Sequence, residues 1–348
     1  IPLGTRILAL ILAALPFQGS AQRASVDALD RQTQQLAQEG RIPDALRSAE
    51  AALALRQAQI GSGHREIGAR LSEIAEFQDG LERYPEAEAT YRRALAITRR
   101  ALGDGDLEVA TLLNNLAQTQ FRAGRLAEAE AAHLQAVAMR EQADHPDLAQ
   151  SLNNLAGIKL AQQSYGEAER LYRRAIAHRE RLLGPGHPDV ALNLANLSHA
   201  YALQRRYAEA LALYDRVLAI RVAAFGPRHP DVAMTHHSIA GVLHALKRPD
   251  EAIATYRRAI ATMEDSVGPR HPMLAMVLNN CADALAEIRR HGEAESMYRR
   301  AIAILEAVTI GTSRELALVL ENLARTLEAQ GKITEALPVR DRLSSKRQ

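Results

Sequence analysis

Apolar residues recur along most of the chain at spacings of three and four residues. Leu152, Leu155 and Ala156 form one such series, and Leu194 and Leu197 occupy the same positions 42 residues later. Side chains at this spacing lie on one face of an α-helix. The pattern therefore predicts amphipathic helices that bury one face each.

A short motif repeats with the same period. His-Pro-Asp followed by Val or Leu and then Ala begins at His145, His187 and His229, and His271 begins a variant with Met in place of Asp. Degenerate copies begin at His64, Asp106 and Ser313. The interval from Asp106 to His145 is three residues shorter than the others, which places the deletion in the loop after Met139. Self-similarity at one period indicates a repeat architecture.

Each unit is expected to hold two helices. Pro and Asp suit the first turn of a helix, so the first helix should follow the His-Pro-Asp turn. The second helices are expected over residues 85–95, 127–137, 167–176, 208–218, 250–260 and 292–302. In these segments small residues alternate with large ones at Ala168 and Tyr172, Ala210 and Tyr214, Ala252 and Tyr256, and Ala294 and Tyr298. This alternation lets neighbouring hairpins pack closely.

Acids and arginines alternate along the second helices. Glu88 and Arg92, Glu169 and Arg173, and Glu295 and Arg299 are i, i+4 pairs. Such a pair on a helix surface is worth about 0.3 kcal/mol. The alternation favours a solvated outer face over a phosphate-binding stripe of arginines.

The composition narrows the classes of protein. The chain has 43 Lys and Arg against 41 Asp and Glu, a formal net charge of +2, which does not favour nucleic-acid binding. Only 4% of its 348 residues are aromatic and none is Trp, so the core must consist mainly of Ala and Leu. The single cysteine, Cys281, excludes a disulfide framework and lies at a predicted core position.

Residues 1–21 resemble a secretory signal. Arg6 is their only charge, Ile7–Leu15 is apolar, Pro16 ends the run, and Gly19 and Ala21 suit cleavage before residue 22. The apolar run is shorter than the roughly 20 residues that span a bilayer. We expect export to the periplasm or the medium, with no membrane span in the mature chain. An uncleaved membrane anchor and a transit peptide are the alternatives.

Motifs of enzymes and cofactor sites are not found. The sequence has no G-x-S-x-G, no phosphate-binding glycine loop, no H-E-x-x-H and no C-x-x-C. The recurring histidines lie about one repeat apart, so they are expected to be turn or cap residues and not a metal centre. No catalytic residue and no cofactor is predicted.

Asparagines in the first helices are the best candidates for a binding site. They occupy two adjacent positions of the repeat, although Asn is a mediocre helix former. The second position holds Asn115, Asn154, Asn196, Asn280 and Asn322, and the first holds Asn114, Asn153 and Asn279, with His237 in one unit. The carboxamides either fix the packing of hairpins or point into a groove and bind the backbone of an extended peptide.

Three histidines form a second, weaker candidate. His237 and His244 are two turns apart on one helical face, and His199 occupies a groove position in the preceding unit. These residues are compatible with a metal or pH-sensing site. Isolated neutral histidines in a groove are the more common case, so no metal is assigned.

The whole pattern resembles a known family. The segment HPDLAQSLNNLAGIKLAQQSYGEAERLYRRAIAHRERLLGPGHPDV is similar to the tetratricopeptide repeats of kinesin light chains and their bacterial relatives. The resemblance covers residues 26–343. It implies an all-α fold, a right-handed α-solenoid superhelix of about eight antiparallel helix pairs within residues 22–348, with the first helices lining the concave side. The units begin near Val26, Ile67, Val109, Leu148, Val190, Val232, Leu274 and Leu316. The last unit would cap the array.

The resemblance also bears on the site. In related domains the Asn at the second position contacts bound peptide, which implies that role for the five asparagines at this position. The basic residues of a carboxylate clamp are not matched, because the corresponding positions hold Thr111, Gln150, Leu192, Met234 and Met276. The three apolar residues offer an adaptable strip for apolar ligand side chains. The coiled coil of kinesin light chains is missing, so association with a motor is not implied.

The sequence therefore predicts a non-enzymatic scaffold that binds an extended peptide or a partner helix in the concave groove. Two alternatives remain open. In the first, the repeats stack on a partner through their outer face or a terminal hairpin. In the second, the chain is an accessory subunit of an enzyme encoded elsewhere. In each case the partner is a protein or peptide and not a nucleic acid.

Overall fold

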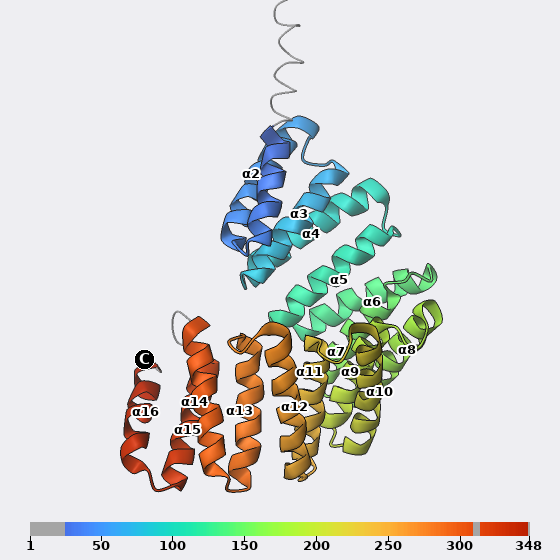
Figure 1. The fold of residues 1–348 in the computed structure, drawn as a ribbon. Coiled ribbons are helices and arrows are strands. Elements are labelled where there is room, and N and C mark those ends of the chain that lie inside the picture. The colour runs from blue at the N-terminus through green and yellow to red at the C-terminus, as the bar shows by residue number, and fades with distance from the viewer. Residues whose placement is uncertain (1–24, 309–313, 347–348) are drawn as a thin grey trace, which may run out of the picture. The chain divides into compact units, whose positions relative to one another are not determined.

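The structure is a computed structural model that describes residues 25–308 and 314–346 (Figure 1). Within these ranges every regular element is a helix. The predicted signal segment, residues 1–21, lies outside the described residues. No helix in the described part of the chain has the length and apolar character needed to cross a membrane.

The helices alternate between first and second members of hairpins. A helix over residues 25–38 precedes α2. The first helices are α3 (Arg65–Gly80), α5 (Leu107–Arg122), α7 (Leu148–Ala161), α9 (Pro188–Leu203), α11 (Pro230–Ala245), α13 (Pro272–Glu287) and α15 (Arg314–Ala329). The second helices are α2 (Ile42–Ile60), α4 (Tyr84–Leu102), α6 (Leu126–Gln142), α8 (Tyr165–Leu183), α10 (Tyr207–Phe225), α12 (Pro249–Val267), α14 (His291–Val308) and α16 (Ile333–Lys346).

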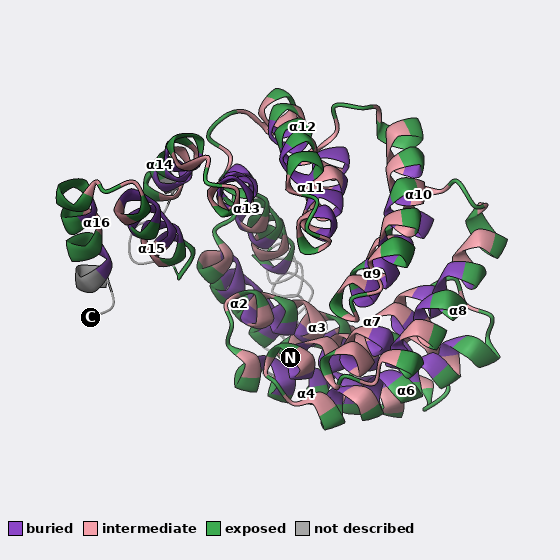
Figure 2. Ribbon diagram, turned by 90° about the horizontal axis from the view of Figure 1, so that it is seen from below, coloured by how far each residue is buried: buried purple, intermediate pink, exposed green. Residues whose placement is uncertain are grey.

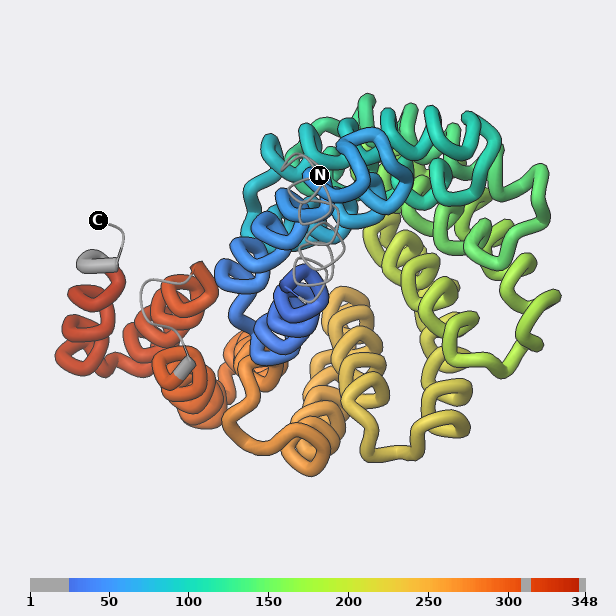
Figure 3. The backbone as a smooth tube through the Cα atoms, turned by 90° about the horizontal axis from the view of Figure 1, so that it is seen from above, coloured from blue at the N-terminus to red at the C-terminus, as the bar shows by residue number. Residues whose placement is uncertain are grey.

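The chain divides into two compact units, one ending at Leu171 and the other beginning at Tyr172 within α8. In the first unit, α3 packs on α4 and α5 on α6, and each hairpin packs on the next. In the second unit, α9 to α16 form four hairpins in the same way (Figure 3). Successive first helices also touch one another, as α5 and α7 do, and α13 with both α11 and α15. The predicted all-α solenoid of antiparallel helix pairs is confirmed.

The recurring motif caps the first helices. The Nδ1 atoms of His187, His229 and His271 each accept a hydrogen bond from the backbone N–H two residues later, at 3.2 to 3.3 Å. His64 and Asp106 do the same for α3 and α5. Because Pro begins the helix after each His-Pro, no backbone donor is lost there. The predicted cap role is confirmed.

One helix departs from this rule. Helix α7 begins at Leu148, and not directly after His145, although His145 Nδ1 still accepts from the Asp147 N–H at 3.2 Å. The loop after α6 is the shortened one, and Asp144 takes a positive φ of 45° to close the turn. The helix after the shortened loop therefore begins two residues later in the repeat than α9, α11 and α13 do.

The core consists of alternating small and large residues, as the sequence predicts. The paired Ala and Tyr residues of α8, α10, α12 and α14 are all buried. Buried residues follow the sides of the helices that face other helices, and exposed residues follow the opposite sides (Figure 2). Cys281 is a free thiol with no exposed surface, which confirms its predicted core position.

The arginines at positions 92 and 299 of the second helices are exposed, as expected, whereas the acids paired with them, Glu88 and Glu295, are not. Both acidic side chains are buried. Glu88 pairs with Arg92 and Arg125 and accepts from Gln120 Nε2 at 3.1 Å. These partners come from the next hairpin as well as from α4. The acid is therefore part of the interface between repeats, a role that depends on the next hairpin and cannot be read from α4 alone.

Candidate functional site

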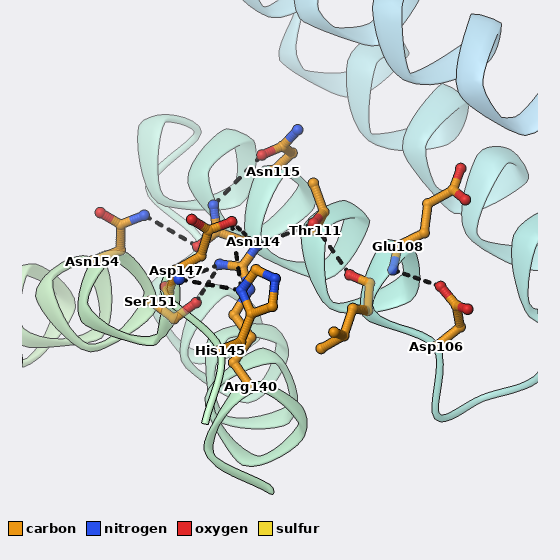
Figure 4. Close-up of polar contacts among 11 residues, drawn as sticks. Asp106, Glu108, Thr111, Asn114, Asn115, Arg140, His145, Asp147, Ser151 and Asn154 are labelled. Atoms are coloured by element: carbon orange, nitrogen blue, oxygen red, sulfur yellow. Dashed lines mark hydrogen bonds and ion pairs between the residues drawn. The ribbon is translucent and has the colours of Figure 1, made fainter. Parts of the chain in front are cut away.

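The predicted asparagines lie in the middle of the first helices. In the first unit, Asn154 Nδ2 on α7 donates to Asn114 Oδ1 on α5 at 3.2 Å (Figure 4). Gln150 Nε2 donates to Asn154 Oδ1 at 2.9 Å. Asn114 Nδ2 approaches Asn115 Oδ1 at 3.5 Å. Asn115 Nδ2 in turn approaches Glu76 Oε1 on α3 at 3.4 Å. The amides thus form a row from one first helix to the next.

The second unit has an equivalent row. Asn322 Nδ2 on α15 donates to Asn279 Oδ1 on α13 at 3.1 Å, and Asn279 Nδ2 donates to Asn280 Oδ1 at 3.2 Å. Asn280 Nδ2 lies 2.9 Å from His237 Nε2 on α11. This set of carboxamides in the second unit, and the equivalent set in the first unit, are each called an amide row below.

The amides differ in exposure. Asn279 and Asn322 are only 5% exposed and lie within the packing between α13 and α15. The remaining predicted amides are half-buried, namely Asn114, Asn115, Asn153, Asn154, Asn196 and Asn280. The hydrogen bonds between helices agree with hairpin packing, which is one of the two roles that the sequence allowed for these carboxamides. The half-buried members also present part of the carboxamide to solvent, so the two roles are compatible.

The three predicted histidines do not come together. His199 is exposed on α9, whereas His237 faces Asn280 and the ring of Tyr256 on α12. Burial lowers the pKa of His237. His244 Nε2 lies 2.5 Å from Glu287 Oε2, and Lys247 Nζ bonds the other oxygen of that carboxylate. Over the described ranges no group of three or more metal-ligating side chains is found.

The sequence reasoning missed a buried arginine beside the amide row. Arg140, at the end of α6, is 3% exposed and donates to Ser151 Oγ on α7 at 2.7 Å and to Thr111 Oγ1 on α5 at 3.0 Å (Figure 4). In the second unit Arg221 likewise donates to Thr235 Oγ1 at 2.9 Å. The signal in the sequence that could have revealed it is the presence of an arginine at the same repeat position of successive second helices. The guanidinium ties each hairpin to the next first helix.

An apolar strip lies on the first helices of the second unit. Leu192, Met276 and Leu318 are 42%, 44% and 53% exposed, and Met234 at the same repeat position is half-buried. On α5 and α7 of the first unit this position holds the polar residues Thr111 and Gln150, and on α3 it holds the small Ala69. The two units therefore present faces of different polarity along otherwise equivalent helices.

The cysteine is unsuited to nucleophilic chemistry. Burial raises the pKa of the Cys281 thiol to about 11, and the nucleophile in thiol chemistry is the thiolate. Together with its position in the core, this makes Cys281 a packing residue.

The repeat pattern, the hairpins and the caps agree with comparison to known proteins. A family model described as tetratricopeptide repeat matches residues 71–142, 147–221, 192–265 and 231–307, which is more than half of the chain. The chain belongs to the tetratricopeptide repeat family. Proteins with these repeats are generally protein-interaction scaffolds. No curated protein matches the chain.

Solved structures of tetratricopeptide repeat proteins share the fold. BtubC (BKLC) from P. vanneervenii is 22% identical over 64% of this chain and 91% of its own, with a TM-score of 0.59. A putative kinesin light chain with nearly identical TPR-like repeats from Podosopora anserina is 22% identical over 58% and 96%, with a TM-score of 0.51. A tetratricopeptide repeat protein from Parabacteroides merdae is 15% identical over 87% and 99%, with a TM-score of 0.58. At these identities the likeness shows the fold alone.

Proposed function

We propose that the chain is a non-enzymatic scaffold that binds an extended peptide, or one helix of a partner protein, along its first helices. The observation that carries the proposal is the amide row. It places half-buried carboxamides on successive first helices, and each carboxamide offers two donors and two acceptor positions. An extended peptide presents N–H and C=O groups in alternation, so amides in a row suit its backbone whatever its side chains.

The bonds within the row leave capacity for a ligand. The two contacts of Asn115, at 3.4 and 3.5 Å, are longer than the roughly 2.7 to 3.2 Å of a good N–H···O bond. Exchanging them for bonds to a peptide therefore costs little. Asn154 uses one donor and one acceptor in its two bonds, which leaves further positions on a half-buried side chain. We expect Asn115 and Asn154 to be the first amides to engage a ligand.

The apolar strip indicates which side chains of the proposed ligand the second unit prefers. Leucine and methionine side chains exposed on α9, α13 and α15 suit apolar side chains of a peptide, and methionine adapts to their shape. We expect peptides with large apolar residues to bind the second unit better than the first.

The test uses the full chain with an array of random decapeptides. Asn115→Ala together with Asn154→Ala should lower peptide capture at least about tenfold, since several hydrogen bonds of about 1 kcal/mol each are lost. Gln135→Ala, which removes an exposed amide from the second helix α6, is the matched control. Unchanged capture by a helical double variant would refute the groove proposal.

A loss of helicity in the double variant would indicate that the row serves packing. Asn115→Ala alone separates the two roles, because its long contacts contribute little to stability. This single variant should keep its circular dichroism and its melting temperature while binding peptide more weakly. Full binding by this well-folded variant would count against the groove.

The second candidate is docking through the terminal hairpin. Leu337 on α16 is 57% exposed, whereas Ile253 at the same repeat position of α12 is 2% exposed beneath the next hairpin. Ile333, one turn earlier, is also exposed. Leu337→Ser should weaken partner capture if this face docks the partner, and should leave it unchanged if the amide row does.

We also propose that residues 1–21 direct export and are cleaved before Gln22. The support is the order of a charge at Arg6, the apolar run Ile7–Leu15 and the small residues Gly19 and Ala21. Sequencing the N-terminus of the protein recovered from the periplasm or the medium tests this. A first residue other than Gln22 would contradict the cleavage site, and recovery only from membranes would favour an uncleaved anchor.

A further inference from the structure

Each unit contains a small cavity between two successive first helices, and the two cavities have the same construction. One is about 300 Å³ and lies between α13 and α15. The other is about 310 Å³ and lies between α3 and α5. These volumes are at the lower end for ligand pockets, roughly 300 to 1,000 Å³, which suits one side chain better than a whole small molecule.

The two cavities are lined by the same residue types at the same repeat positions. Each has an acid on the first helix, a tyrosine on the second helix, and an asparagine and a threonine on the next first helix. In the second unit these are Asp283, Tyr298, Asn322 and Thr326, and in the first unit Glu76, Tyr91, Asn115 and Thr119. They are called the Asp283 notch and the Glu76 notch below.

The acids are specific to these two repeats. The equivalent position of the intervening first helices holds Gln118, Gly157, His199 and Gly241, none of which is acidic. The repeat fold itself therefore does not require a carboxylate here. In the two repeats that do carry the acid, it shares its cavity with a tyrosine and an asparagine.

Asp283 is held firmly but is not neutralised. Its Oδ1 accepts from Tyr298 Oη at 2.5 Å and from Asn322 Nδ2 at 3.1 Å, and its Oδ2 accepts from Asn279 Nδ2 at 3.2 Å. A carboxylate has about four acceptor positions, so Oδ2 keeps one. No ion pair of Asp283 is found in the described residues. Burial raises the pKa of this carboxyl, which reflects a charge with too little compensation.

The neighbouring charged side chains make their closest contacts with other partners, although Arg325 and His244 still offset part of the effect of burial on the Asp283 carboxyl. Arg325, which lines the Asp283 notch, donates to Asn322 Oδ1, and Glu287 on the rim is paired with His244 and Lys247. In the Glu76 notch, Arg122 pairs with Asp79. Among the residues that the structure describes, Glu76 accepts only the long contact from Asn115 at 3.4 Å. In both notches the acid of the first helix is left to face the cavity.

We propose that each notch receives a basic side chain, Arg or Lys, of a peptide bound along the amide row of its own unit. The proposal rests on the proposed function and adds the charge of the ligand to it. The cation would take the remaining acceptor position of Asp283 and the open acceptors of Glu76. Three donors already orient the carboxylate of Asp283, so binding a cation costs little further free energy for ordering this side chain. A bond between a charged donor and a charged acceptor is about twice as strong as one between neutral groups.

The test compares arginine with citrulline, a neutral side chain of nearly the same shape. Decapeptides captured by the full chain from a random array are resynthesised with each Arg replaced by citrulline, and dissociation constants are measured by fluorescence polarisation. We expect Arg peptides to bind at least about tenfold more tightly than their citrulline forms. Asp283→Asn and Glu76→Gln should each reduce this ratio, and the double variant should bring it close to one.

Asp265→Asn, which neutralises an exposed acid on α12 outside the notches, is the control and should leave the ratio unchanged. Circular dichroism checks that the variants remain folded. A structural role of Asp283 would weaken Arg and citrulline peptides equally, so the ratio isolates the contact with the cation. If peptides bind but their affinity does not change when Arg is replaced by citrulline, the notch proposal is overturned and the proposed function is not. An array from which no peptide binds would overturn the proposed function, and this inference with it.

Discussion

His133 makes the stability of the first unit depend on pH. It lies on α6 at the repeat position that holds the buried Tyr91, Tyr172 and Tyr214 in other units. The side chain is 0% exposed, and neither Nδ1 nor Nε2 has a hydrogen-bond partner in the described residues. Burial, and to a smaller extent the charge of Arg140, lowers its pKa from 6.5 to about 4. Folding therefore requires the neutral imidazole down to that pH.

The magnitude follows from the two pKa values. Between pH 6.5 and about 4 the unfolded chain binds a proton at His133 that the folded chain does not. The free energy of unfolding falls through this range by about 1.4 kcal/mol per pH unit, a total of about 3 kcal/mol. Above pH 7 both states are neutral, and His133 contributes no pH dependence.

His133→Tyr restores the residue of the other repeats and removes the titrating group. We expect variant and parent to differ little at pH 8, and the variant to become more stable by about 3 kcal/mol relative to the parent at pH 4. Urea unfolding followed by circular dichroism at five pH values measures this difference. Contributions of the other titrating groups cancel, because the two chains differ at one residue.

The same substitution at an exposed histidine is the control. His199→Tyr on α9, where the histidine is exposed, shows what the introduction of a tyrosine does by itself in the same assay. If the curves of His133→Tyr and the parent run parallel from pH 8 to pH 4, then His133 is protonated in the folded chain, and the reasoning from burial is refuted.

Further predictions concern single contacts. Arg140→Met should lower the free energy of unfolding by about 1 to 3 kcal/mol, because the buried Ser151 hydroxyl on α7 loses its donor; no change in the urea midpoint would contradict this. Glu88→Gln should lower the free energy of unfolding by a similar amount, because it leaves arginines beside a neutral group. Glu86→Gln at an exposed site should change this free energy by less than about 0.5 kcal/mol in the same assay. Gly241→Ala should raise the melting temperature, since its new methyl meets only an ordinary contact at 3.6 Å and a helix gains up to about 1 kcal/mol from this change. Gly68→Ala should not, because its methyl would stand 2.7 Å from a buried hydroxyl oxygen of α4; equal gains at both sites would refute the reasoning.

Much of the fold was predictable because the repeat carries its own local signals. The i, i+3, i+4 stripe sets each helix, and the His-Pro-Asp motif sets where it begins, since the His ring caps the helix and Pro needs no donor. The candidate site was predictable only in part. The asparagines were found because Asn is unusual in a helix, whereas Asp283 and Glu76 gave no such signal in a chain rich in acids.

The sequence by itself determined the helices, their pairing and their caps, because these depend on neighbours within about 42 residues. Only the tertiary structure decided what each equivalent residue does. Asn115 and Asn322 share one repeat position, yet the first is half-buried with long contacts and the second is 5% exposed beside Asp283. Glu88 likewise reads as a surface acid until the next hairpin covers it. Burial and charge compensation depend on which residues pack around a side chain, and these neighbours differ between residues at the same repeat position.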